Sequence, residues 1–114
     1  MVELIEDAVK SHPASEGSPP IQAVIQKAAE WGKKFQELAG TSWQPPLVET
    51  HSTGEISFQW WNPKTEKAGW VYLDAEFVGL LWVWGETDDD MEYFHISSPE
   101  EWQSMWEWLN ATFH

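Results

Sequence analysis

The spacing of apolar residues predicts a long amphipathic helix in the first half of the chain. Apolar side chains recur three or four positions apart over residues 21–38, which places them on one face of an α-helix. This stripe consists of Ile21, Val24, Ile25, Ala28, Trp31, Phe35 and Leu38. Ser18 is suited to cap the helix with Pro19 at its first position, and Gly40 is suited to end it.

A second amphipathic helix is predicted close to the C-terminus. The sequence Ser98-Pro99-Glu100-Glu101 has the pattern of a capping box, with a proline and two acidic residues where the first helical turn favours them. The apolar stripe that follows consists of Trp102, Met105, Trp106 and Leu109. We therefore expect a helix that begins directly after Ser98 and buries this stripe.

Between the two helices the apolar pattern changes to a period of two, which is typical of β-strands. Residues 41–53 are expected to form an extended connection. Strands are expected over residues 55–61, 69–76 and 78–84, and a fourth, at an edge of the sheet, over residues 91–96. This order predicts an α+β fold: an antiparallel three- to four-stranded meander flanked by an N-terminal and a C-terminal amphipathic helix, both packed on one face.

The two central strands are apolar on both of their faces, whereas a sheet with one face in water alternates apolar and polar residues. In the first of these strands, for example, Trp70 and Tyr72 alternate with Val71 and Leu73. The second face of the sheet is therefore also expected to be covered. The cover could be the N-terminal segment of the same chain, a second copy, or a different protein.

The length of 114 residues is sufficient for one domain with one core. Residues 2–9 could form one or two helical turns, and residues 11–20 (SHPASEGSPP) have the composition of a connector. We therefore divide the chain into a flexible or partly helical N-terminal segment, residues 1–20, and a single α+β domain, residues 21–114.

Charge is distributed unevenly, with a net value of −13 and no arginine. No lysine follows residue 67, while residues 68–114 contain ten carboxylates and six tryptophans. Contact with phosphate backbones needs basic side chains, so the composition argues against direct nucleic-acid binding, and anionic membrane surfaces should repel the protein. Unpaired negative charge instead suits a cationic partner.

No cysteine is present, which leaves no disulfide, no thiolate nucleophile and no cysteine ligand for a metal. The first residues are acidic where a secretory signal would be basic. No apolar run is long enough to span a bilayer. We therefore expect a cytoplasmic protein.

The acidic segment between the third and fourth predicted strands is the one cluster with metal-ligand chemistry. Its carboxylates are Glu86, Asp88, Asp89, Asp90 and Glu92. Such a cluster can chelate a divalent cation, but it lacks the glycine and glutamate spacing of an EF-hand loop. A solvated hairpin connection is the simpler interpretation, and these residues are better placed to attract a basic partner than to bind a metal.

No recognisable reaction centre is present. The four histidines are scattered, with no two at the spacing of ligands on a zinc-binding helix. Asp74 and Glu76 share a face of the second predicted strand, like a glycosidase pair, but a domain of this size leaves little room for a substrate cleft. No nucleophile elbow or phosphate-binding loop occurs. We expect a protein that is not an enzyme and uses no cofactor or metal.

Most of the ten tryptophans are expected to fill the core, because they follow the helical and strand periodicities. Trp61 and Trp108 differ from the others. Trp61 shares its strand face with Ser57 and Gln59, and Trp108 lies off the stripe that contains Trp102. Exposed tryptophans can act as hot spots for a protein partner, so both residues are predicted to anchor one.

From Pro19 onward, the layout resembles that of a group of small bacterial proteins. The shared features are a proline-opened helix, here Pro19-Pro20-Ile21, a proline-containing link, Pro45-Pro46-Leu47-Val48, and a G-E-I-x-F-x-W strand at residues 54–60. Some members also end in a Trp-rich helix like residues 102–109. The resemblance implies a bacterial or phage origin and a shared type of fold. That group has no established activity, so the resemblance implies no functional residues.

Together these features predict an acidic, non-enzymatic binding protein of inhibitor, antitoxin or immunity-protein type. It would mask a basic surface of a partner protein, as nucleic-acid mimics do. The acidic segment would steer the partner, and Trp61 and Trp108 would anchor it. Two alternatives remain open: a small-ligand or carbohydrate-binding module with a tryptophan platform, and a homo-oligomer, such as a homodimer, that pairs through the second face of the sheet.

Overall fold

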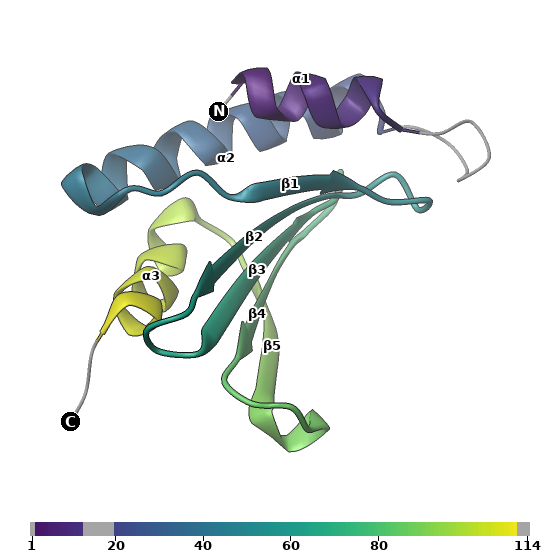
Figure 1. Cartoon of the computed structure of the whole chain (residues 1–114). Helices are drawn as coiled ribbons and strands as arrows, with labels where there is room; N and C mark the ends of the chain where they lie inside the picture. Colours follow the sequence, from purple (N-terminus) through teal and green to yellow (C-terminus); the bar gives the residue numbers. More distant parts are fainter. Residues whose placement is uncertain (1, 13–19, 112–114) are drawn as a thin grey trace.

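In the computed structural model, which describes residues 2–12 and 20–111, a five-stranded antiparallel sheet carries its helices on one face (Figure 1). The helices are α1 (Val2–Lys10), α2 (Gln22–Ala39) and α3 (Trp102–Asn110). The strands are β1 (Leu47–Thr50), β2 (Ile56–Asn62), β3 (Lys67–Leu73), β4 (Val78–Val83) and β5 (Met91–Ile96). Short 3-10 turns occupy Gly40–Ser42, Asp88–Asp90 and Pro99–Glu101.

The predicted α+β meander is confirmed, with one strand more than the pattern indicated. The additional strand is β1, which lies in the segment expected to be an extended connection and is only four residues long. It pairs with β2, Val48 lying opposite Phe58, and the strand order is β1-β2-β3-β4-β5. β3 ends at Leu73, three residues before the expected boundary, because Asp74 belongs to the turn that leads into β4.

α2 begins at Gln22, with Ile21 in an extended conformation at the N-cap position. The expected cap at Ser18 and Pro19 lies outside the described residues. The helix ends at Gly40, as predicted, and the positive φ of 58° at this glycine is a conformation that residues with a Cβ rarely adopt.

The predicted capping box before α3 is confirmed. The Glu101 carboxylate accepts hydrogen bonds from the backbone N–H groups of Ser97 and Ser98, at 2.6 and 3.0 Å. These two backbone hydrogen bonds hold the pKa of Glu101 below its ordinary value, because they favour the charged carboxylate. The segment Pro99–Glu101 forms a 3-10 turn that runs directly into α3.

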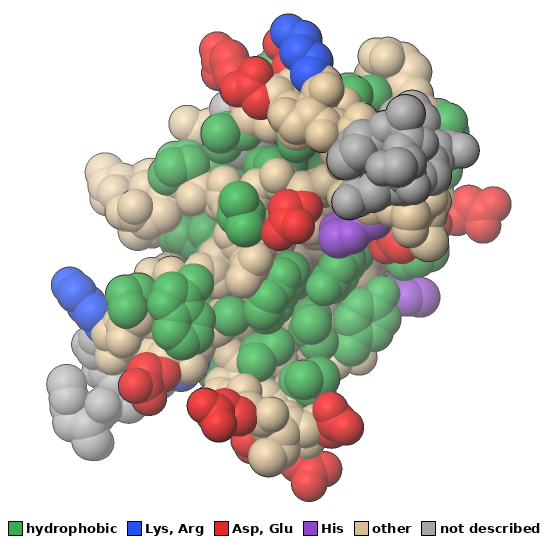
Figure 2. Space-filling model, turned by 45° about the vertical axis from the view of Figure 1, so that its right-hand side comes forward, with side chains coloured by type: hydrophobic (Ala, Val, Ile, Leu, Met, Phe, Trp, Pro, Cys, Tyr) green, Lys and Arg blue, Asp and Glu red, His purple; other side chains and the backbone are tan. Residues whose placement is uncertain are grey.

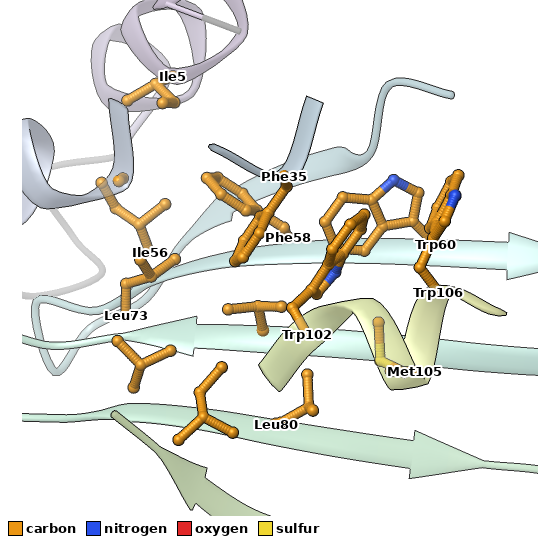
Figure 3. Close-up of a cluster of buried hydrophobic side chains, with 14 of the residues drawn as sticks. Ile5, Phe35, Ile56, Phe58, Trp60, Leu73, Leu80, Trp102, Met105 and Trp106 are labelled. Atoms are coloured by element: carbon orange, nitrogen blue, oxygen red, sulfur yellow. The ribbon is translucent and has the colours of Figure 1, made fainter. Parts of the chain in front are cut away.

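The core lies between the helices and one face of the sheet, and aromatic rings fill its centre (Figure 3). The Phe35 ring of α2 stacks on Trp102 of α3 with the ring centroids 4.6 Å apart, and Trp102 stacks on Trp106 at 5.0 Å. Trp60 of β2 contacts all three rings from the sheet. Such rings bury a large apolar area, which stabilises a chain whose net charge opposes folding.

α3 is held close to the sheet by small and polar residues of β2, β3 and their connection. A Cβ atom at Gly69 would overlap the Met105 side chain, so the glycine allows α3 to approach β3. The Asn62 side chain donates a hydrogen bond to the Leu109 carbonyl at 2.9 Å. The Lys67 ammonium donates a hydrogen bond to the carbonyl of Trp108, two residues before the end of the helix, at 3.0 Å. These contacts supply hydrogen-bond donors to carbonyls in the last turn of α3, and the Trp108 carbonyl also accepts a hydrogen bond from the Ala111 N–H.

α1 lies beside α2 and against β1, on the helix side of the sheet (Figure 1). Its Ile5 side chain is buried in the core. His12 Nδ1 lies 2.8 Å from Thr50 Oγ1, and this hydrogen bond joins the end of α1 to β1. Residues 2–12 therefore share the core of the rest of the described chain and do not cover the second face of the sheet.

Candidate interaction surface

The face of the sheet that points away from the helices is apolar and aromatic, and no described helix or strand lies over it. Figure 2 shows hydrophobic side chains gathered in the middle of this view, above a group of acidic ones. The strand register arranges the residues of this outer face in three rows. The rows are Leu47, Gln59, Trp70, Leu81 and Tyr93; Glu49, Ser57, Tyr72, Gly79 and His95; and Trp61, Ala68, Val83 and Met91.

Exposure on the outer face is high for several of its large side chains. Trp61 is 58% exposed and Tyr93 is 49% exposed, while Trp70 and Tyr72 are half-buried against their neighbours. A contiguous apolar patch of this kind is uncommon on a protein that acts alone and is typical of an interaction site. Of the covers expected from the sequence, the described part of the N-terminal segment, residues 2–12, packs with α2 and β1 on the opposite side of the sheet and does not cover this face.

The two predicted anchors, Trp61 and Trp108, lie on different faces. Trp61 belongs to the outer face, whereas Trp108 lies on the helix side of the sheet. The Trp108 ring is 4.9 Å from the Trp82 ring, and the Lys67 ammonium lies 4.9 Å from the Trp108 ring centroid. The structure therefore does not bring the two residues together, and a partner on the outer face would contact Trp61 alone.

The predicted acidic residues lie in and beside the connection between β4 and β5, at one end of the strands. Glu86, Asp88 and Asp89 are exposed, and we call them the hairpin acids. Between described residues the structure holds one ion pair, Lys34 with Glu37 on α2 at 3.9 Å. The hairpin acids therefore have no lysine partner in the described part of the chain, and their field extends into solvent.

Asp90 and Glu92 have different surroundings from the hairpin acids. Asp90 Oδ2 accepts hydrogen bonds from the Thr87 N–H and hydroxyl groups, at 3.3 and 3.0 Å, so this carboxylate shapes the turn. Glu92 is paired with Trp82 across the strands, which places it on the helix side. Within residues 2–12 and 20–111, no three His, Asp or Glu side chains form a group that could hold a metal ion.

At the other end of the strands, the β1–β2 turn and two tyrosines form a hollow of about 390 Å³, which we call the tyrosine pocket. It is lined by His51, Ser52, Thr53, Glu55, Tyr72 and Tyr93. The Tyr72 and Tyr93 ring centroids are 6.5 Å apart and the ring planes are inclined at 56°. The His51 ring lies 6.1 Å from the Tyr72 ring and is fixed by a hydrogen bond of 2.8 Å between His51 Nε2 and Ser57 Oγ.

The tyrosine pocket is electronegative. Burial raises the pKa of Tyr72 above its ordinary value of 10.0, and Glu55, Tyr93 and Glu49 raise it further. Burial and Glu55 also raise the pKa of Tyr93. A carboxylate raises a tyrosine pKa because it repels the phenolate. The negative charge of Glu55 therefore acts on both rings.

We predict that Tyr72→Phe reduces the loss of stability at alkaline pH. The pKa of Tyr72 is higher in the folded protein than in the unfolded chain. The contribution of this difference to the free energy of unfolding is fully present below about pH 10 and is lost as the pH rises through the folded-state pKa. Phenylalanine cannot ionise. Thermal unfolding midpoints should therefore fall less in the variant than in the wild type between about pH 9 and pH 11. Equal falls in the two proteins would contradict the prediction.

A second hollow, of about 650 Å³, lies beside Trp61 at the β2–β3 end of the sheet. Polar residues that line it include Gln44, Gln59 and Asn62. An exposed indole ring beside amide groups is an arrangement that can hold a sugar ring. This hollow is the feature that supports the carbohydrate-binding alternative.

The comparisons with known proteins find no match. No family model matches the sequence, no curated protein matches it, and no solved structure matches the fold. None of the described helices combines the length and the apolar character needed to cross a bilayer. Function is therefore inferred from the outer face itself, and the likeness of residues 19–60 to small bacterial proteins stays a prediction.

Sequence reasoning missed the tyrosine pocket. The two-sided apolar pattern identified Tyr72 as a residue of the second face, but it did not select Tyr93 or Glu55. A Cβ atom at Gly79 would overlap the Tyr93 ring, so this glycine allows Tyr93 to lie across β4 toward Tyr72. The sequence signal for this pocket is a glycine on the outer face of one strand beside an aromatic residue on the next strand. This signal can be recognised only when the pairing register of the strands is known.

Proposed function

We propose that this protein is a non-enzymatic binding protein of inhibitor, antitoxin or immunity-protein type, which docks a basic partner protein on its outer face. The observation that carries the proposal is an aromatic face, bordered by carboxylates, that no described helix or strand covers. Tyrosine and tryptophan are the side chains that most often dominate the energetics of an interface. The acidic, cysteine-free composition suits a cytoplasmic protein, and we place the interaction in that compartment.

The distribution of charge favours a basic partner on this face. The hairpin acids lie at one end of the outer face, and Glu49 and Glu55 lie at the other. Lys10, Lys33 and Lys34 are on α1 and α2, behind the sheet, and Lys27 and Lys67 donate hydrogen bonds to backbone carbonyls. Lys64 lies in the β2–β3 connection and lines the hollow beside Trp61, so it is a cation at the border of this face. An anionic surface of this kind attracts a cationic protein and orients it before contact.

A homodimer through the outer face is less favourable than a complex with a basic protein. Two copies would bring two net charges of −13 together, and the carboxylates of Glu49 and Glu55 would lie within or beside the shared interface. Like charges brought together at an interface cost free energy. A basic partner would neutralise the same carboxylates, so the proposal commits to a different protein rather than to a second copy.

Affinity capture with matched bait proteins tests the proposal. The baits are the wild type, the outer-face variant Leu47→Ala/Trp61→Ala and the control variant Val2→Ala/Leu4→Ala, whose exposed side chains lie on α1. From a lysate of the source organism, the wild type and the control should retain one basic protein in stoichiometric amount. High salt should release it, and the outer-face variant should retain much less, because the anchor side chains are lost.

Equal retention by all three baits would show that the outer face is not the docking site. An empty wild-type lane at low salt would exclude attraction by the acidic surface. The carbohydrate-binding alternative predicts a different result: quenching of tryptophan fluorescence by a sugar, insensitive to salt and lost in Trp61→Ala. Light scattering at high protein concentration separates the homodimer from both.

A further inference from the structure

We propose that the tyrosine pocket binds the ammonium group of a lysine side chain, which the docked partner inserts between Tyr72, Tyr93 and Glu55. This inference rests on the proposed function, since it names the chemical group that the basic partner would present. It concerns Tyr72, Tyr93 and Glu55, whereas the capture experiment above replaces Leu47 on β1 and Trp61 on β2, neither of which lines the pocket.

The arrangement of the rings favours a compact cation. The faces of Tyr72 and Tyr93 are inclined at 56° with centroids 6.5 Å apart, so they form a corner rather than a parallel slot. A cation over an aromatic face is attracted when it lies within about 6 Å of the ring centroid. An ammonium group can approach both faces of such a corner, whereas a planar guanidinium stacks flat on one ring.

Glu55 supplies the negative charge that an inserted ammonium needs. Its carboxylate is oriented by the Thr53 hydroxyl, which donates a hydrogen bond to Glu55 Oε1 at 2.9 Å. After burial, which is the main cause, the Glu55 carboxylate also contributes to the raised pKa values of Tyr72 and Tyr93. No described lysine lines the pocket. A cation that enters therefore meets two ring faces and one unneutralised carboxylate.

The side chains that line the pocket are held in place by their neighbours. Gly79 leaves the space in which the Tyr93 ring lies, and the Tyr93 ring also packs edge-on against His95 at 5.6 Å. His51 is held on Ser57, the one buried polar residue among those described. Side chains that are fixed before binding lose little conformational entropy when the ligand arrives, which favours affinity.

The test uses N-acetyl-lysine methylamide as the probe and follows the tyrosine ring resonances by NMR. The matched probe is the same compound acetylated at Nε, which keeps the chain length but has no charge. The charged probe should produce saturable shifts of the Tyr72 and Tyr93 resonances, and the acetylated probe should produce none. Equal shifts with both probes, or no saturable shift with the charged probe, would overturn the proposal.

Three variants separate the contribution of the tyrosine ring from that of the Glu55 carboxylate to binding of the charged probe. Tyr93→Leu removes one ring face and should weaken binding of the charged probe about two- to fivefold, while Tyr93→Phe keeps the ring and should bind as the wild type does. Glu55→Gln should weaken binding by a similar factor, about two- to fivefold. The control is Glu6→Gln, which removes an exposed carboxylate from α1 and should have no effect.

The outcome is distinguishable from that of the proposed function. If the pocket shows no preference for the charged probe while the Leu47→Ala/Trp61→Ala variant still loses the captured partner, the lysine site is wrong and the docking face stands. If the pocket binds the charged probe but none of the baits retains a basic protein, the lysine site stands as a small-cation site, and the partner-docking proposal is wrong.

Discussion

Replacement of Trp102 by alanine is expected to lower the free energy of unfolding by about 3–5 kcal/mol. Trp102 has no exposed surface and contacts three rings, with centroid distances of 4.6 Å to Phe35, 5.0 Å to Trp106 and 5.4 Å to Trp60. Its truncation would leave a cavity where α2, α3 and the sheet meet. A small domain is stable by only about 5–15 kcal/mol, so the variant should be close to unfolding. Urea denaturation followed by tryptophan fluorescence measures the change.

Two further substitutions make this result interpretable. Trp61→Ala removes a tryptophan that is mostly exposed, so it should change the free energy of unfolding by no more than about 0.5 kcal/mol. Trp102→Phe should cost less than Trp102→Ala, because the smaller ring refills part of the cavity. It also removes the buried Trp102 indole N–H, which has no hydrogen-bond partner in the described part of the chain. Equal losses in the free energy of unfolding for Trp61→Ala and Trp102→Ala would contradict a core that contains Trp102 and excludes Trp61.

Reversing the charge of the hairpin acids to lysine is expected to slow association with the captured partner on the order of tenfold to a hundredfold at low salt. Glu86, Asp88 and Asp89 are exposed and carry no ion pair to a described lysine, so their whole field is available to attract a cation. The dissociation rate should change much less, because these side chains border the apolar face rather than belong to it. Stopped-flow association rates at two ionic strengths measure both the slowing and the reduced salt dependence.

The control for this variant is a second triple reversal with the same change in net charge. Glu3, Glu6 and Asp7 are exposed on α1, behind the sheet. Their reversal should slow association much less, because the hairpin lies beside the docking face and screening shortens the reach of more distant charges. If both triple variants slow association equally, the attraction comes from total charge and the hairpin has no special part in it.

The fold could be predicted largely from periodicity, because the chain signals its helices strongly. The stripe of α2, the capping box before α3 and the alternation in β2 each follow from the sequence alone. β1 could not be predicted in the same way. Its four residues follow two prolines, and what makes them a strand is pairing with β2, with Leu47 opposite Gln59. That pairing is a tertiary contact and overrides the weak local pattern.

The candidate site was predictable only in part. Sequence position alone indicated that the acidic residues gather at one hairpin and that a second apolar face exists. It could not distinguish Trp61 from Trp108, because the position of Trp108 depends on how α3 is rotated against the sheet. It also could not reveal the tyrosine pocket, because Tyr72 and Tyr93 meet through the register of β3, β4 and β5 and through the space above Gly79.

Each strand pairs with the strand that precedes or follows it in the sequence, and this arrangement determines which contacts are entropically costly to form. Each strand pair is closed by a short connection, so little chain entropy is lost when a hairpin forms. The contact between Phe35 and Trp102, by contrast, joins segments separated by the whole sheet sequence. Closing that long loop costs more entropy than closing any hairpin. The compensating free energy of burying the aromatic rings is gained only when the aromatic cluster is complete. We therefore expect α3 to join α2 late in folding, after the hairpins have formed.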